Sequence, residues 1–569
     1  MNGFSGKLKE TLLDWKTVVP VAAASLLSFG WQLFRSNVGI DDMIRERYRN
    51  GGLFSQGRFT GPFIRYPLGL FKIFPLLELI YAILFITAAA LLLIIAFDKA
   101  SKGGLSKGVL TFFACAFISY PLINELFVYK GSNLNSGVGY FLTAILLLMT
   151  SGIRLGKNSG AEDPEGISEK GRKKNKFLTV LRISGAVLVS MAIVSLYEAF
   201  AAVYLVLASL YVFTEIVFSE KKPLKGSGVP DNTHFVKKFF ILVLPAFAGI
   251  IIEFAVGTLL TKLIDFGITV PPGSNIALPT SLSAGYFVDM FYSIFRKLFL
   301  AGLWYFPIGL FVMCLGAGLV LFIAVGAAKK RGSVILCAAG TLAGLFGISI
   351  LTGGAVKYRT CLSFAPFVAF VMALLVYYAC RGSKPKALKV LTAVCATVMV
   401  AVLVVNLNIY FCNNDLRWEE EKAVLVDCCE KLSSGEYSIG EKPVIFIGEY
   451  TLSDDIMSRK FVRADDPLYK AVKSAAVAAG FRLETTDCNE TYVLAANQAD
   501  FGSVISWGID DRFSCNEELL LVIKYLGYEF IPGTMERYEE LSANKEAYPA
   551  INETGLATEL DDCIVVRFK

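Results

Sequence analysis

The chain has 569 residues, of which 55% are hydrophobic and only 18% are charged. Soluble globular domains are about one quarter charged, so the composition excludes an ordinary soluble protein and predicts many membrane-spanning helices. The net charge of +6 is unevenly divided, because residues 412–569 hold 16 Lys and Arg against 30 Asp and Glu. The sequence therefore predicts a basic transmembrane domain, 1–411, followed by an acidic domain, 412–569.

Eleven apolar segments are each long enough to cross a bilayer as a helix, which takes about 20 residues. They lie at 17–36, 76–97, 107–129, 138–156, 177–197, 199–218, 237–263, 297–327, 333–353, 360–380 and 388–411. The first follows a lysine-bearing N-terminus and lacks a small-residue cleavage site, so we expect an uncleaved span. The fifth and sixth are joined by so short a turn that a re-entrant pair is an alternative.

The charge of the connecting loops alternates along the chain. Every even-to-odd connection, such as AKKRGS and CRGSKPKALK, is rich in Lys and Arg, and these residues mark the cytoplasmic side of a membrane. We therefore expect a multi-pass protein of the cytoplasmic (inner) membrane with its N-terminus in the cytoplasm. The other connections and the acidic C-terminal domain would then be extracytoplasmic.

The acidic domain shows strand and helix patterns in turn. KPVIFIGEY and CIVVRF are typical of short buried strands. Asp466 as N-cap and Pro467 at the first helical position predict one helix, and a capping box of Ser514 and Glu517 predicts another. The fold class expected is a polytopic α-helical membrane protein of about 11 spans with a small C-terminal extracytoplasmic α/β domain.

Two adjacent carboxylates, Asp41 and Asp42, follow the first span in NVGIDDMIRERYRNGGLFSQGRF. They could be solvated groups at a loop end. They could equally supply a general base and a metal ligand, because neighbouring carboxylates raise one pKa and an oxygen-rich pair suits Mg or Mn. Arg58 lies beyond them in the same loop.

Three short motifs carry a resemblance to a known family. The first is the "IDD…GR" pattern of GIDDMIRERYRNGGLFSQGRF, the second is SLYEAF with Glu198, and the third is the stretch FISYPLINELFVYK with Glu125. These resemble motifs of the type II glucosyltransferases of O-antigen conversion, within the C-type glycosyltransferase superfamily. Glu198 stands where that family usually has Gln, and the third motif departs after Glu125.

The resemblance covers roughly residues 20–410 and leaves the acidic domain outside. It implies a glycosyltransferase that uses a polyprenyl-phosphate sugar, most often glucose. It also implies catalytic roles for Asp41, Asp42, Glu125 and Glu198. The expectation that Asp41 and Asp42 hold Mg or Mn comes from the paired carboxylates themselves.

Two basic residues and an aromatic stand on the expected outer side in TGGAVKYRTCLSF: Lys357, Tyr358 and Arg359. They could be an interfacial anchor, which is common at span ends. Because they run against the charge bias, they also suggest an anionic partner such as a lipid phosphate, which Arg grips with two donors. Arg58 and Arg65 could share that substrate-binding role.

Glu198 and Glu125 are carboxylates at or inside the expected spans, where an ionisable residue is a functional-site hypothesis. The alternative for each is a hydrogen-bonded structural role. Glu253 and Asp265, around the outer half of 237–263, rank below them. The single His234 lies in a basic loop and excludes a histidine-based triad or zinc site. Nothing resembles a nucleotide-binding loop or a nucleic-acid surface.

The function expected is transfer of a hexose, glucose by preference, from polyprenyl phosphate to a cell-surface polysaccharide or teichoic-type acceptor at the outer membrane face. One carboxylate of the aspartate pair would deprotonate the acceptor hydroxyl. The alternative is a transporter or flippase of lipid-linked sugars. Such proteins often show inverted repeats and broken midplane helices, and neither pattern is visible in the sequence.

Overall fold

The computed structural model describes most of the chain. The described residues are 2–35, 58–70, 74–153, 169–219, 232–263, parts of 288–298, 303–351, 358–434, 437–478, 492–495, 503–509, 515–551 and 556–568. Asp41, Asp42, Lys357 and Asp265 lie outside them, so the predictions made for these four residues stay predictions.

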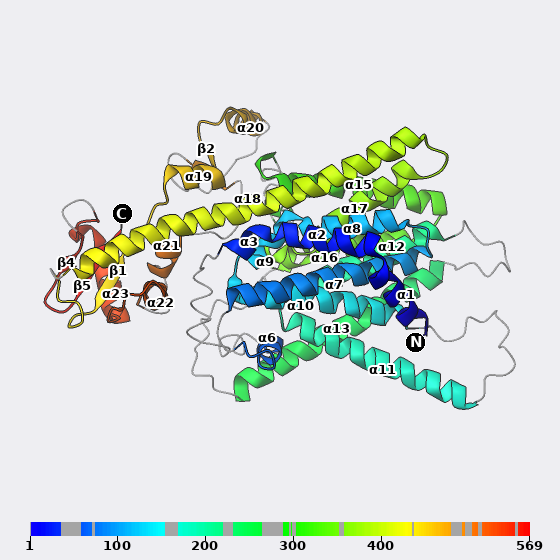
Figure 1. Ribbon diagram of the computed structural model, residues 1–569, viewed down its shortest axis with the longest axis horizontal. Coiled ribbons are helices and arrows are strands. Elements are labelled where there is room, and N and C mark those ends of the chain that lie inside the picture. The colour runs from blue at the N-terminus through cyan, green and yellow to red at the C-terminus, as the bar shows by residue number, and fades with distance from the viewer. Residues whose placement is uncertain are drawn as a thin grey trace.

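Helices make up the described part of the transmembrane domain and run roughly along one direction (Figure 1). The first are α1 Asn2–Leu13, α2 Trp15–Ser28, α3 Gly30–Phe34, α6 Thr60–Arg65, α7 Pro75–Ser101, α8 Lys107–Ser119, η1 Pro121–Ile123, α9 Asn124–Phe127, η2 Lys130–Ser132 and α10 Asn133–Ser151. Then follow α11 Glu169–Val194, α12 Ala199–Phe218, α13 Asn232–Leu263, α15 Phe306–Lys329, α16 Ser333–Leu351, η3 Tyr358–Thr360, α17 Phe364–Cys380 and α18 Lys386–Ser433.

Each of the eleven expected spans contains a helix in its described part. Eight of the described helices are long and apolar enough to cross a membrane: α7, α10, α11, α12, α13, α15, α16 and α18. A ninth would be the pair Lys107–Ser119 and Pro121–Phe127, which is bent by 43°; the Pro121 ring disfavours a helical conformation at Tyr120. Trp15–Ser28 and Phe364–Cys380 are shorter apolar helices. The chain is thus a membrane protein, and eleven crossings stay a prediction.

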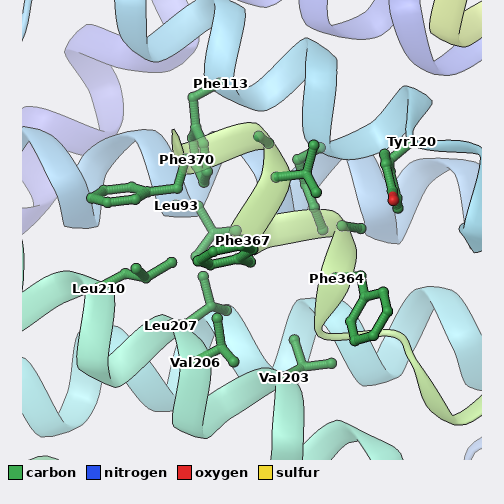
Figure 2. Packing of buried hydrophobic residues seen from close by; sticks show 14 of the residues in the cluster. Leu93, Phe113, Tyr120, Val203, Val206, Leu207, Leu210, Phe364, Phe367 and Phe370 are labelled. Carbon is green, nitrogen blue, oxygen red and sulfur yellow. The ribbon is translucent and has the colours of Figure 1, made fainter. Parts of the chain in front are cut away.

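Aromatic side chains of α17 fill the centre of the bundle. Phe364, Phe367 and Phe370 lie among Leu93 of α7 and valine and leucine side chains of α12 (Figure 2). Phe364 stacks on Phe311 of α15 with ring centroids 3.6 Å apart and planes 3° from parallel. Lipid tails are as apolar as these side chains, so close packing contributes more here than removal of apolar surface from water. The core therefore fixes how α7, α12, α15 and α17 sit against one another.

The two ends of the bundle differ in chemistry. At the end that carries α1, Lys107 pairs with Glu10 and Asp14 at 3.3 and 3.2 Å, and Lys238 pairs with Glu215 at 2.6 Å. The opposite end carries α3, α6 and α9 (Figure 1), together with η3 and the turn between α11 and α12. We call it the distal end. Which end faces the cytoplasm stays a prediction.

The acidic domain is a small α/β unit. Its elements are β1 Val444–Ile447, α19 Asp454–Lys460, β2 Phe461–Arg463, α20 Pro467–Ala478, β3 Tyr492–Ala495, α21 Val504–Ile509, α22 Glu517–Tyr525, α23 Met535–Ala543, η4 Lys545–Ala547, β4 Thr558–Glu559 and β5 Ile564–Arg567. One sheet has the order β1-β5-β4, with β1 and β5 parallel, and β2 pairs with β3 antiparallel.

The predicted strands in KPVIFIGEY and CIVVRF are confirmed as β1 and β5. The N-cap of α20 is also confirmed, because Asp466 accepts a hydrogen bond from the Tyr469 N–H at 2.9 Å. The predicted N-cap position at Ser514 is wrong, and Ser514 itself lies outside the described residues. α22 begins at Glu517 with Asn516 as its N-cap residue, in a left-handed conformation (φ 54°), where its side-chain oxygen accepts from the Phe446 N–H of β1.

A single helix, α18, joins the two domains. It is 48 residues long, about 70 Å at 1.5 Å per residue, and the composition boundary after residue 411 falls inside it. Its far half is fixed to the acidic domain by two carboxylates. Glu421 accepts from the Ile505 N–H at 3.2 Å, and Glu420 accepts from the Tyr450 hydroxyl at 3.0 Å and the Ser453 N–H at 2.8 Å.

Helices α7 and α10 approach so closely that only glycine fits at their contact. A Cβ at Gly137 would lie 2.6 Å from both the Cα and the carbonyl oxygen of Ala82. We expect Gly137→Ala to lower the free energy of unfolding by about 1–3 kcal/mol, the usual cost of overpacking. Thermal unfolding of the purified protein in detergent measures it. Gly316→Ala is the control, because a Cβ there meets nothing within 4 Å. Equal stability of both variants would contradict the close contact.

Candidate functional site

The turn between α11 and α12 holds the first ion pair of the distal end. α11 ends at Val194, and the chain turns through Tyr197 and Glu198 before α12 begins. A terminal nitrogen of Arg58 donates to Glu198 at 3.3 Å, and the guanidinium lies over the Tyr197 ring, 5.1 Å from its centroid. The two charged side chains are 30% and 41% exposed, and ion pairs this accessible add at most about 1 kcal/mol to stability. Stability alone therefore does not account for the pair.

Arg58 uses only part of its hydrogen-bonding capacity. Its buried Nε–H has no hydrogen-bond partner among the described residues, although a guanidinium carries five donors in a fixed fork. A buried donor without a partner costs about 1–3 kcal/mol. The arrangement suits a ligand that supplies further acceptor oxygens.

A second arginine reaches the same tyrosine. Arg359 lies on η3, and its charge acts with that of Arg58 on the Tyr197 phenol. Burial raises the pKa of Tyr197 to about 12, and the two cations oppose the rise. The phenol is therefore protonated at neutral pH and can donate a hydrogen bond. The structure thus brings together two cations, an aromatic donor and one carboxylate from three separate stretches of chain.

Arg65 is engaged in a different way. Its side chain is fully buried, and it donates to Asn135 of α10 at 2.8 Å and to Glu78 of α7 at 2.6 Å, and also to the Gly131 carbonyl. These three acceptors tie the last turn of α6 to two spans. The geometry favours a supporting role for Arg65 over direct contact with a substrate.

The segment between Arg58 and Arg65 is fixed by small contacts as well. The hydroxyls of Thr60 and Ser195 are hydrogen-bonded to each other. A Cβ at Gly61 would lie 2.9 Å from the Asn135 amide nitrogen, so α6 packs directly on α10. Arg58 therefore enters the turn between α11 and α12 from a segment that is held at both ends.

Glu125 lies near η3, beside a cluster of tyrosines. It is buried on α9, and its charge acts on Tyr305, Tyr358 and Tyr410. The Tyr305 ring is 5.2 Å from Tyr410 and 5.7 Å from Tyr358, centroid to centroid. η3 therefore contributes to two groups, with Tyr358 in the tyrosine cluster and Arg359 near Tyr197.

Sequence reasoning missed three residues of this end. Glu78 is an acidic residue in the first turn of an apolar span, and such a residue predicts a basic partner nearby. Tyr197 is the direct neighbour of Glu198, which the motif singled out. Asn135 gave no signal, because a polar residue near a span end is common.

The described part of the chain contains no group of three His, Cys, Asp or Glu side chains placed to hold a metal. The metal role assigned to Asp41 and Asp42 falls outside the described residues and stays a prediction.

A family model described as "Glucosyl transferase GtrII" matches residues 30–377, more than half of the chain. The matched part includes Arg58, Glu125, Glu198 and Arg359, and it ends within α17. It leaves α18 and the acidic domain outside the match. No curated protein matches the chain.

The buried Arg65–Glu78 pair generates a stability prediction. Arg65→Met leaves the Glu78 carboxylate without its cation, and loss of one partner of a buried pair costs about 3–5 kcal/mol. The double change Arg65→Met with Glu78→Leu removes both charges and should recover most of that loss. Thermal unfolding of the purified variants measures both effects. Arg381→Met, at an exposed arginine of the opposite end, is the control. A double variant no more stable than the single one would argue against the ion pair.

Proposed function

The chain belongs to the glucosyl transferase GtrII family, and on that premise we propose that it moves glucose from a polyprenyl-phosphate donor to a cell-surface polysaccharide, such as an O-antigen or a teichoic-type polymer. The proposed place of reaction is the distal end of the bundle, at the outer face of the cytoplasmic membrane. The observation that carries the proposal is the convergence of Arg58 and Arg359 on Tyr197.

An anionic lipid headgroup fits this convergence. Guanidinium groups recognise phosphate with paired, charge-assisted hydrogen bonds, and the buried Nε–H of Arg58 has no partner among the described residues. Both arginines stand at one end of an apolar bundle, at the level where the headgroup of a membrane-held donor would lie. A polyprenyl chain needs the surrounding lipid, whereas a soluble sugar nucleotide does not.

In the proposed reaction one carboxylate of the Asp41 and Asp42 pair takes the proton from an acceptor hydroxyl. The resulting oxygen attacks the anomeric carbon, the bond from that carbon to the phosphate oxygen breaks, and its electron pair leaves with polyprenyl phosphate. Direct displacement inverts the anomeric centre. Arg58 and Arg359, with Lys357 two residues before Arg359, stabilise the charge that develops on the leaving phosphate. The carboxylate that is not the base is the proposed ligand of Mg or Mn.

The other candidate residues take supporting places in this scheme. Glu198 holds Arg58 at 3.3 Å, and Arg65 fixes the segment that carries Arg58. Tyr358 faces Glu125 and the tyrosine cluster, so it helps to set the orientation of η3. We assign the acidic domain to the acceptor side, because α18 fixes it beyond the distal end (Figure 1).

Donor binding should depend on both arginines. In Arg58→Ala and Arg359→Ala the apparent KM for polyprenyl-phosphate glucose should rise about ten- to a hundredfold, since a hydrogen bond to a charged group is worth about 1.5–3 kcal/mol. Lysine at either position should restore only part of the affinity, because it lacks the planar fork. The assay is transfer of radiolabelled glucose to a purified polysaccharide acceptor. Arg381→Ala, at the opposite end, is the control. An unchanged KM in both variants would return the arginines to an anchoring role.

Asp41 and Asp42 should affect turnover (kcat), whereas the two arginines should affect donor binding. Asn keeps the size of Asp and removes its charge, so Asp41→Asn and Asp42→Asn should fold normally. General-base catalysis contributes about 10²- to 10⁴-fold, and the variant of the base should lose that factor in kcat with little change in donor KM. The variant of a metal ligand should regain activity with excess Mg or Mn. Near-normal turnover in both variants would remove the pair from the mechanism and leave Glu125 and Glu198 as candidates.

A further inference from the structure

One carboxylate of the distal end has no role in the scheme above. Glu253 lies on α13, and its neighbours Ile251 and Phe254 are 56% and 59% exposed, as expected of side chains that face lipid. Glu253 itself is only 7% exposed. A carboxylate on a membrane span turns inward and requires a partner. The groups that α13 packs against on that side therefore indicate what Glu253 interacts with.

The packing of α13 on α11 determines which way Glu253 faces. Ala246, Gly249 and Glu253 follow each other at spacings of three and four residues and so share one face of the helix. The Ala246 carbonyl accepts from the Ser190 hydroxyl of α11 at 2.7 Å, and a Cβ at Gly249 would lie 2.5 Å from the Ser190 Cβ. The contact line between the two helices therefore leads to Glu253 on α13 and to the C-terminal end of α11.

That end of α11 is the turn that carries the Arg58–Glu198 pair. The charges of Glu198 and Arg58 both act on the Glu253 carboxyl. Two carboxylates would repel each other in this setting, and the single guanidinium offsets the repulsion. Arg58 thus has one carboxylate bonded to it at 3.3 Å, and a second carboxylate, on α13, lies near enough to interact with it by charge.

We propose that Glu253 is a positioning residue for the donor phosphate. It restricts the guanidinium of Arg58 from the α13 side while Glu198 holds it from the α12 side. With Glu198 alone, the guanidinium of Arg58 could still rotate about its bond to that carboxylate. A second carboxylate sets the direction in which the remaining N–H donors of Arg58 point. This inference rests on the proposed function, because the ligand oriented in this way is the phosphate of the lipid-linked sugar.

The expected kinetic signature is a change in donor affinity that passes through Arg58. Glu253→Gln removes a negative charge that acts on Arg58. If the loss of this charge interaction is about 1 kcal/mol, the donor KM should rise about fivefold with kcat nearly unchanged. Glu253→Gln also removes repulsion between Glu253 and the donor phosphate, which by itself would lower the donor KM. We expect this effect to be the smaller one, since the guanidinium of Arg58 interacts with both groups. Glu253→Asp should recover part of the affinity.

A double-mutant cycle separates positioning from a general effect on folding. In an Arg58→Ala background, Glu253→Gln should cause no further rise in KM, because the residue it acts through is gone. Glu215→Gln is the matched control. It removes a carboxylate of α12 that is paired with Lys238 at the opposite end, and it should leave the donor KM unchanged.

The same cycle measured by thermal unfolding, without donor, tests the contact independently of the reaction. Coupling between Arg58 and Glu253 in both readouts supports the inference. Additive effects in unfolding would overturn it, and coupling in unfolding with an unchanged donor KM would reduce Glu253 to a structural partner and overturn it as well. If the wild-type protein does not transfer glucose from polyprenyl phosphate, the proposed function and the positioning role fail together, and the unfolding cycle alone reports on the contact.

Discussion

The buried ion pair of Arg65 and Glu78 fixes the place where the segment from Arg58 to Arg65, at the distal end, joins the helix bundle. A guanidinium without solvent must find acceptors for its donors, because an unpaired buried charge is costly. Here the acceptors come from α7, from α10 through Asn135, and from the Gly131 carbonyl, so α6 has one compatible position. Arg58 lies seven residues before this anchor. The geometry of the candidate phosphate site therefore depends on a charge pair that would not touch the substrate.

The apolar core of the bundle fixes the positions of Tyr197 and Arg359 in the site. The turn with Tyr197 leads directly into α12, and η3 with Arg359 leads into α17. Both helices meet in the aromatic core of Phe364, Phe367 and Phe370 (Figure 2). Close packing leaves little freedom to shift one helix along the other. The separation of the two arginines is consequently set by side chains deep in the bundle, and changes there would reach the site without touching it.

α18 ties the acidic domain to the same framework. Its first half lies along the outside of the bundle, against α2, α8 and α17, and its second half carries Glu420 and Glu421, which accept hydrogen bonds from the acidic domain. A continuous helix offers no hinge at the composition boundary. A domain mounted in this way keeps a constant distance from the distal end, which suits a part that meets a polymeric acceptor.

The sequence by itself determined the helical membrane class, the strands and the N-cap of the acidic domain, and the family, because apolar run length, alternation and short motifs are local properties of the chain. It also pointed to Arg58, Glu198 and Arg359 individually. Only the tertiary structure decided which charges meet. The burial of Arg65 against Glu78, the convergence of Arg58 on Glu198 and the use of Asn516 as the N-cap residue of α22 all depend on partners distant along the chain. Periodicity cannot encode such pairings, since the energy of a buried charge is set by the groups that folding brings around it.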